Sequence, residues 1–232
     1  MSMDVVLALF EFVVLVLAIS LHDAAQAWVA SRKGDPTARM LGRISLNPVK
    51  HFDLFGTIIW PALFIFRSPL VLGWGKPLPI TPRNFRRPDR DEMIVYLCGP
   101  IAHLFGAAVC LILLLFFKHF TPDGAASLQV AAALALRNPA VSTLDLPSLF
   151  PIVLFLYFGI LINLLLFVFN LLPLPSLDGG KILRHFLPYN AQKTFDSIGL
   201  YLMFGFMFIG FRIILIFFVP LLLFFDGLLG AL

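Results

Sequence analysis

The chain has 232 residues, of which 60% are hydrophobic, 14% are aromatic and only 13% are charged. Soluble domains carry about 25% charged residues, so this composition excludes an ordinary soluble protein and predicts a chain embedded in the lipid bilayer. The net charge of +4 does not indicate a nucleic-acid partner, because no basic patch is interleaved with polar, base-stacking side chains.

Apolar segments recur along the whole chain and predict one integral membrane domain, 1–232. The fold class expected is all-α and polytopic, with about four transmembrane helices. The first helix is predicted over 3–33 and stops at the Gly/Pro signal that begins at Gly34. Within the following region, 34–92, the apolar stretch 54–72 is interrupted by Pro61 and Pro69, which indicates a short re-entrant or hairpin-like segment.

Three further spans are expected later in the chain. They cover 93–117, 150–172 and 198–224, and the third of the four spans leads into an Asp-Gly segment that ends near 183. Eleven of the seventeen Lys and Arg residues lie between Arg32 and Arg90, so the positive-inside rule places 34–92 in the cytoplasm and 118–149 outside. The sequence thus predicts a multi-pass protein of the cell membrane, in contact with lipid.

The end of the first helix carries a group of polar residues. His22 and Gln26 are four residues apart and so share one helix face, with Asp23 beside them. In the pattern His-Glu-x-x-His, two such ligands hold zinc and the carboxylate activates a metal-bound water. Only the first ligand is intact here, so the motif taken alone favours a polar helix end at the membrane interface over a metal site. Their position within the membrane favours a functional role, because ionisable groups are costly there.

A second polar group follows the third span. Two prolines, Pro173 and Pro175, force an extended segment before Asp178, which is followed by a glycine. Asp178 could cap the helix that begins there, or it could be a ligand. Asn163 and Asn170 lie seven residues apart on one helix stripe, which could bind a neighbouring helix or an unwound substrate strand, and Asn170 is therefore a candidate substrate-binding residue.

These motifs, taken in order, resemble those of the site-2 proteases, the intramembrane zinc metalloproteases, in their small prokaryotic form. The resemblance runs from His22 to about Leu183 and includes the segments Gly34-Asp35-Pro36, Gly42-Arg43, Asn47-Pro48, His51-Phe52-Asp53, Gly73-Trp74-Gly75-Lys76-Pro77, Gly99-Pro100 and Asn170 to Gly179. It implies a three-helix core, zinc as the cofactor, and Asp178 as the third metal ligand. The implied reaction is hydrolysis of a peptide bond in a transmembrane protein substrate by zinc-activated water, in a site that opens toward the cytoplasm.

The departures from the family pattern fall on the chemistry. Asp23 replaces the catalytic glutamate and is shorter by one methylene, and Gln26 replaces the second histidine with a weaker amide donor. His103 stands where the family has asparagine, so we hypothesise that it supplies the missing imidazole beside His22 and Asp178. Whether Gln26 or His103 completes the metal site is left open.

An active intramembrane metalloprotease is the leading prediction. The alternatives are a catalytically inactive homologue that binds membrane segments and, less favoured, a small transporter.

Overall fold

A computed structural model of the chain describes all residues except 1, 67, 69 and 139–145. Its main helices are α1 (Met3–Lys33), α2 (Thr37–Met40), α3 (Trp60–Phe64), α4 (Pro88–Phe120), α5 (Gly124–Ala135), α6 (Phe150–Leu171), α7 (Asp178–Arg184) and α8 (Tyr189–Ala231). The described part of the chain contains no strand, and four of its helices are long and apolar enough to cross a membrane. The predicted all-α polytopic fold with four spans is confirmed.

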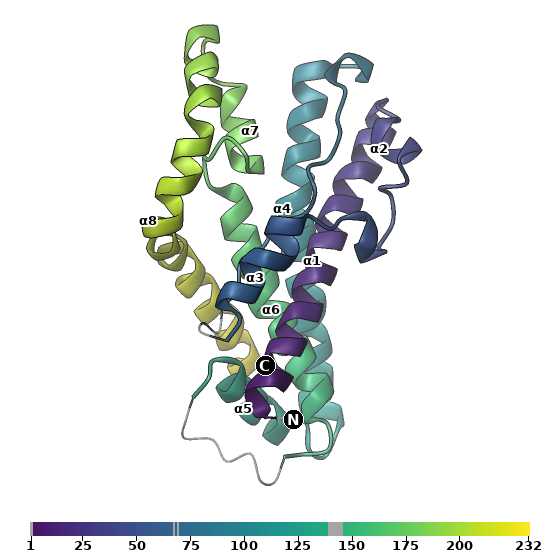
Figure 1. The fold of residues 1–232 in the computed structure, drawn as a ribbon. Coiled ribbons are helices and arrows are strands. Elements are labelled where there is room, and N and C mark those ends of the chain that lie inside the picture. Colours follow the sequence, from purple (N-terminus) through teal and green to yellow (C-terminus); the bar gives the residue numbers. More distant parts are fainter. Residues whose placement is uncertain (1, 67, 69, 139–145) are drawn as a thin grey trace.

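Helix α6 forms the centre of the bundle. In its most apolar window 83% of the residues are buried, against 50% in α1, 39% in α4 and 28% in α8. The outer faces of α1, α4 and α8 therefore meet lipid, as the exposed side chains of Leu9, Phe105 and Phe217 show. Figure 1 shows these long helices side by side, with α2 and α7 toward one end of the bundle and α5 toward the other.

The segments between the spans contain more helix than expected. A π-helical turn, Leu54–Ile59, continues directly into α3, and this short apolar segment stands where the re-entrant segment was predicted. The predicted outer loop 118–149 contains α5 and lies partly outside the described residues. Helices α4 and α8 extend beyond both ends of the apolar spans 93–117 and 198–224, because polar turns continue each helix past its apolar part.

A buried aspartate fixes the turn that ends α1. Gly34 stops the helix in the left-handed conformation with φ 116°, which favours glycine. Asp35 is fully buried and accepts hydrogen bonds from the backbone N–H of Thr37 and Thr81 and from the Asn84 amide. Burial raises the pKa of Asp35, but these hydrogen bonds outweigh it and hold the pKa below its usual range.

A second polar contact lies toward the end of the bundle where the amino terminus is found. Glu11, in the middle of α1, is fully buried, and its Oε2 lies 3.6 Å from an Arg137 nitrogen. Arg137 also donates to the Ile65 carbonyl and lies 3.6 Å from the Asp4 carboxylate. One arginine therefore ties α1 to the segment after α3, which supplies a partner for Glu11 that the sequence does not reveal.

Replacing Asp35 tests how firmly this turn is held. We expect Asp35→Ala to lower the free energy of unfolding in detergent micelles by about 2–4 kcal/mol, because several buried donors lose their acceptor. Asp89→Ala, at an exposed position of α4, is the control and should change the free energy of unfolding far less. Because the folded-state pKa of Asp35 is depressed, its contribution is present above about pH 4 and is lost as the pH falls further. Equal losses of unfolding free energy in Asp35→Ala and Asp89→Ala would contradict the role of Asp35 in holding this turn.

Candidate functional site

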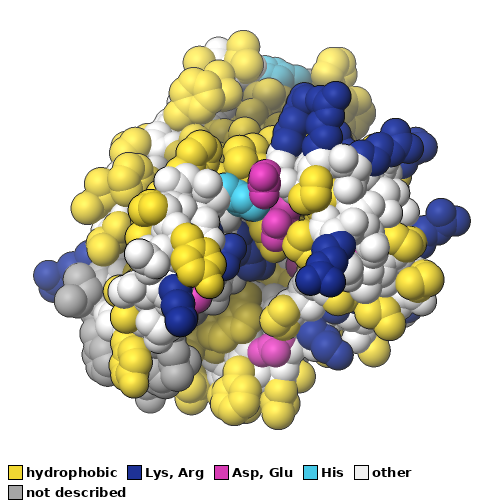
Figure 2. Space-filling view, turned by 90° about the horizontal axis from the view of Figure 1, so that it is seen from above, with side chains coloured by type: hydrophobic (Ala, Val, Ile, Leu, Met, Phe, Trp, Pro, Cys, Tyr) yellow, Lys and Arg dark blue, Asp and Glu magenta, His cyan; other side chains and the backbone are white. Residues whose placement is uncertain are grey.

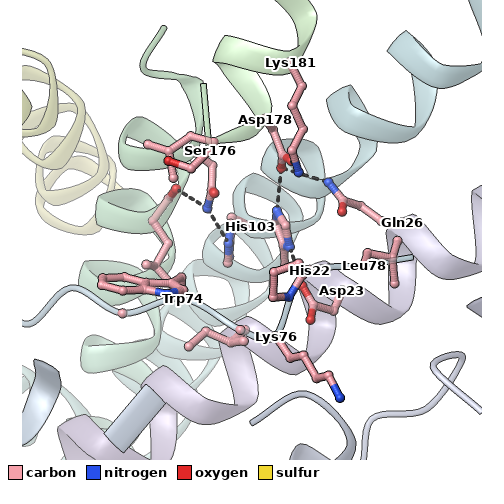
Figure 3. Close-up of a pocket in the computed structure, with 17 residues that line it drawn as sticks. His22, Asp23, Gln26, Trp74, Lys76, Leu78, His103, Ser176, Asp178 and Lys181 are labelled. Carbon is pink, nitrogen blue, oxygen red and sulfur yellow. Dashed lines mark hydrogen bonds and ion pairs between the residues drawn. The ribbon is translucent and has the colours of Figure 1, made fainter. Parts of the chain in front are cut away.

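The polar residues of α1 and α7 meet at one cavity of about 170 Å³. It is lined by His22, Asp23 and Gln26 from α1, the segment 73–78, His103 from α4, Asn170 from α6, and Asp178 and Lys181 from α7. Figure 3 shows His22 and Gln26 pointing toward Asp178 from the neighbouring helix. The structure therefore brings together all six predicted site residues.

Glycines bring α7 close enough for Asp178 to enter the cavity. A Cβ atom at Gly179 would overlap the Leu171 carbonyl at the end of α6, and one at Gly180 would overlap the Leu174 carbonyl. A third glycine, Gly99 in α4, faces the site itself, and a Cβ there would overlap the His22 imidazole and the Gln26 amide. The glycines explain why the Asp-Gly-Gly and Gly-Pro motifs accompany the polar residues.

His22 lies between two carboxylates. Its Nδ1 is 3.0 Å from Asp23 Oδ1, and its Nε2 is 2.8 Å from Asp178 Oδ2. An ionised carboxylate only accepts hydrogen bonds, so each ring nitrogen must carry a proton to satisfy both contacts. With both carboxylates ionised, this arrangement leaves His22 no free lone pair for a metal ion.

Asp178 accepts a second hydrogen bond at the same oxygen. The Gln26 Nε2 donates to Asp178 Oδ2 over 2.8 Å, and Lys181 Nζ lies 3.9 Å from the other oxygen, Oδ1. Asp178 is only 3% exposed, so these contacts replace its solvation by water. With its nitrogen toward Asp178, the Gln26 amide acts as a donor to the carboxylate.

Asp23 is held by residues from the loop after α2. Its Oδ2 accepts a hydrogen bond of 2.8 Å from Arg43 and lies 3.2 Å from His51 Nδ1. Arg43 also donates to the Lys76 carbonyl, and His51 Nε2 donates to the Ser45 carbonyl. Both oxygens of Asp23 therefore contact neighbouring side chains, and these contacts compete with any water that Asp23 would deprotonate.

The sequence analysis did not assign Arg43 or His51 to the site. Both lie in segments that resemble the family, Gly42-Arg43 and His51-Phe52-Asp53, so the signal was present. Because the contacts join residues at least 20 positions apart, spacing along the chain could not reveal them.

His103 is close to His22 but directed away from Asp178. The two imidazole rings stack with their centroids 4.9 Å apart. The His103 Nδ1 lies 3.1 Å from Asn163 Oδ1, and its Nε2 lies 3.5 Å from the Asn170 amide nitrogen. The two asparagines of α6 therefore position the ring.

These donors do not fit a zinc centre as they lie. Catalytic zinc sites use three protein ligands that converge on the ion and leave one position for water. Within the described residues, no group of three His, Cys, Asp or Glu side chains is placed to hold a metal ion. The predicted ligands His22 and Asp178 already form a hydrogen bond with each other, and Gln26 donates to the same Asp178 oxygen. The predicted metal-ligand roles of His22, Gln26, His103 and Asp178, and the catalytic role of Asp23, stay predictions.

The four spans, with a polar cavity where α1, α4, α6 and α7 meet, define a multi-pass membrane protein with a polar site inside its helix bundle. The profile of Peptidase family M50 matches residues 10–210, and the chain belongs to this family, that of the site-2 proteases. The chain is also 33% identical over 215 residues to "Putative zinc metalloprotease YwhC" of Bacillus subtilis (strain 168), which covers 92% of this chain and 82% of that protein. No solved structure matches. Family membership implies zinc and a membrane environment.

Substitution of Arg43 tests the contact that holds Asp23. Arg43→Ala leaves a buried carboxylate with fewer partners and should lower the free energy of unfolding by about 3 kcal/mol. In the double variant Arg43→Ala/Asp23→Ala, the loss should be smaller than the sum of the two single losses by at least about 1 kcal/mol. Arg39→Ala, at an exposed position of α2, is the control. Additive single effects, measured by unfolding in detergent, would show that the pair is not coupled.

Proposed function

We propose that this chain binds an unwound segment of a transmembrane protein in the cell membrane and does not cleave it by zinc-dependent hydrolysis. The observation that carries the proposal is that Asp178 Oδ2 accepts hydrogen bonds from both His22 and Gln26. A metal ion would have to displace both donors and take a proton from His22, and the residues offer no third strong ligand in return. The fold of the family is kept, while the groups needed for hydrolysis are engaged with one another.

The segment 73–78 offers a way to hold an extended chain. One of its edges is already paired, because Trp74 N–H donates to the Gly56 carbonyl and Lys76 N–H donates to the His51 carbonyl. The carbonyls of Trp74 and Lys76 accept from Thr57 and Arg43. Alternate residues of an extended strand present their backbone groups to the opposite edge. Gly75 has no backbone hydrogen bond to another described residue, so its peptide groups are available for β-strand addition.

An apolar hollow of about 310 Å³ lies on the other side of Trp74, which lines both cavities. It is surrounded by Trp60 and Phe64 of the short apolar segment and by Phe169 and Phe206 of α6 and α8. A strand paired with Gly75 would place alternate side chains in different environments, and this hollow suits a large apolar one. These properties fit a hydrophobic membrane segment better than a polar solute.

Hydrolysis of a transmembrane protein by metal-activated water is the second candidate. Family membership favours it, and so does the convergence of His22 and Gln26 on one oxygen of Asp178. Turning the Gln26 amide by 180° would present Oε1 in place of Nε2, which adds a weak oxygen donor to the two strong ones. The metal would still lack a free carboxylate to accept the proton of a bound water, since Asp23 is held by Arg43.

A photo-crosslinker in place of Leu78, which lines the cavity, tests binding and cleavage together. Co-expressed single-span reporters with a glycine-proline break should be captured intact by the parent chain. Asn170→Ala should reduce capture several-fold, because its amide lines the cavity, and Asn190→Ala at the exposed start of α8 should not.

The matched control restores the family pattern with Asp23→Glu, Gln26→His and His103→Asn. This variant should bind zinc and cleave the captured reporter, because three ligands and a longer carboxylate are then present. Zinc-dependent cleavage by the parent chain would overturn the proposal in favour of the second candidate, and absence of capture by the parent would overturn the binding function.

A further inference from the structure

A cluster of basic side chains lies at the end of the bundle near α2 and away from the polar cavity. Arg32 and Lys33 from the last turn of α1 and Arg86, Arg87 and Arg90 from the start of α4 line a single hollow of about 440 Å³. We call these five residues the basic cluster. Figure 2, which views this end of the molecule, shows several Lys and Arg side chains at its edge and acidic side chains beside a His near its centre.

The hollow is held in shape by contacts between the two helices. Arg86 N–H donates to the Lys33 carbonyl over 3.4 Å, which joins the end of α1 to the segment before α4. The remaining lining residue, Asp91, is 5% exposed, and its carboxylate lies 3.5 Å from Lys33 Nζ and accepts from the Arg87 backbone N–H. The only acid in the lining is therefore already engaged.

The arginines of the cluster lack acidic partners within the part of the chain that the structure describes. No salt bridge there involves Arg32, Arg86, Arg87 or Arg90, and all four are exposed. Four exposed guanidinium groups around one hollow create a positive potential there, which attracts anions. Guanidinium groups match phosphate oxygens through paired hydrogen bonds.

The surroundings of the cluster indicate a lipid as the source of the phosphate. Trp28, one turn before Arg32 on α1, is 51% exposed, and the Arg32 guanidinium lies 5.4 Å from the centre of its ring. Tryptophan prefers the membrane interface, where its ring lies at the depth of the headgroups. A lipid bound here would place its phosphate among the arginines and its chains along the apolar face of α1.

We propose that the basic cluster is a binding site for the phosphate headgroup of an anionic lipid. The site is separate from the polar cavity and does not depend on the function proposed for it. Anchoring of α1 and α4 to the cytoplasmic leaflet would be its consequence.

The test is native mass spectrometry of the full chain in detergent, titrated separately with short-chain phosphatidylglycerol, short-chain phosphatidylcholine and inorganic phosphate. The parent should form a saturable adduct with one phosphatidylglycerol. The variant Arg86→Gln/Arg87→Gln/Arg90→Gln should bind it on the order of 100-fold more weakly, since each basic residue near a membrane surface contributes about fivefold.

The control is Arg39→Gln/Lys50→Gln/Lys193→Gln, which removes the same charge from exposed positions outside the cluster. It should keep the parent affinity, and both variants should keep the parent unfolding midpoint. Equal loss in the two triple variants, equal binding of phosphatidylcholine by the parent, or absence of a one-lipid adduct would overturn the proposal. Equally tight binding of inorganic phosphate would also overturn it and would define a site for the free anion.

Discussion

The contact of His22 with two carboxylates organises the rest of the site. Two buried negative charges, on Asp23 and Asp178, require compensation, and His22 lies between them within hydrogen-bonding distance of both. The remaining partners follow from this arrangement: Arg43 reaches Asp23 from the loop, and Gln26 donates to Asp178. The network joins α1 to α7 and to the loop after α2.

Two departures from the family motif, Asp23 and Gln26, both remove a group that the family uses for metal chemistry. The shorter Asp23 is engaged by Arg43 and His51, and the amide of Gln26 supplies an N–H to Asp178. Each substitution converts a position that the family uses for metal chemistry into a hydrogen-bonding partner. The third departure, His103, keeps its ring nitrogens toward Asn163 and Asn170. Gly99 leaves room for the side chains of His22 and Gln26, and Gly179 lets α7 approach the end of α6.

Apolar run length and helix-stop signals were sufficient to predict the all-α fold and its four spans, because the bilayer imposes them directly. The residues of the cavity were also foreseeable, since family motifs mark His22, Asn170 and Asp178 in order. The hydrogen-bond partners of these residues could not be foreseen. Whether a carboxylate faces a cation or a free cavity depends on side chains from distant segments, as with Arg43 and Asp23, and no local pattern encodes it. The contact between Arg137 and Glu11 also joins distant segments, so no local pattern encodes it either.

The central claim is that the site is complete without a metal ion. It is tested most directly by the zinc content of the purified full chain, measured by elemental mass spectrometry after purification without chelator, with His22→Ala and Asp178→Ala as comparisons. We expect far less than one zinc ion per chain in the parent, and no difference between the parent and either variant. A content of about one zinc ion per chain that is lost in both variants would contradict it.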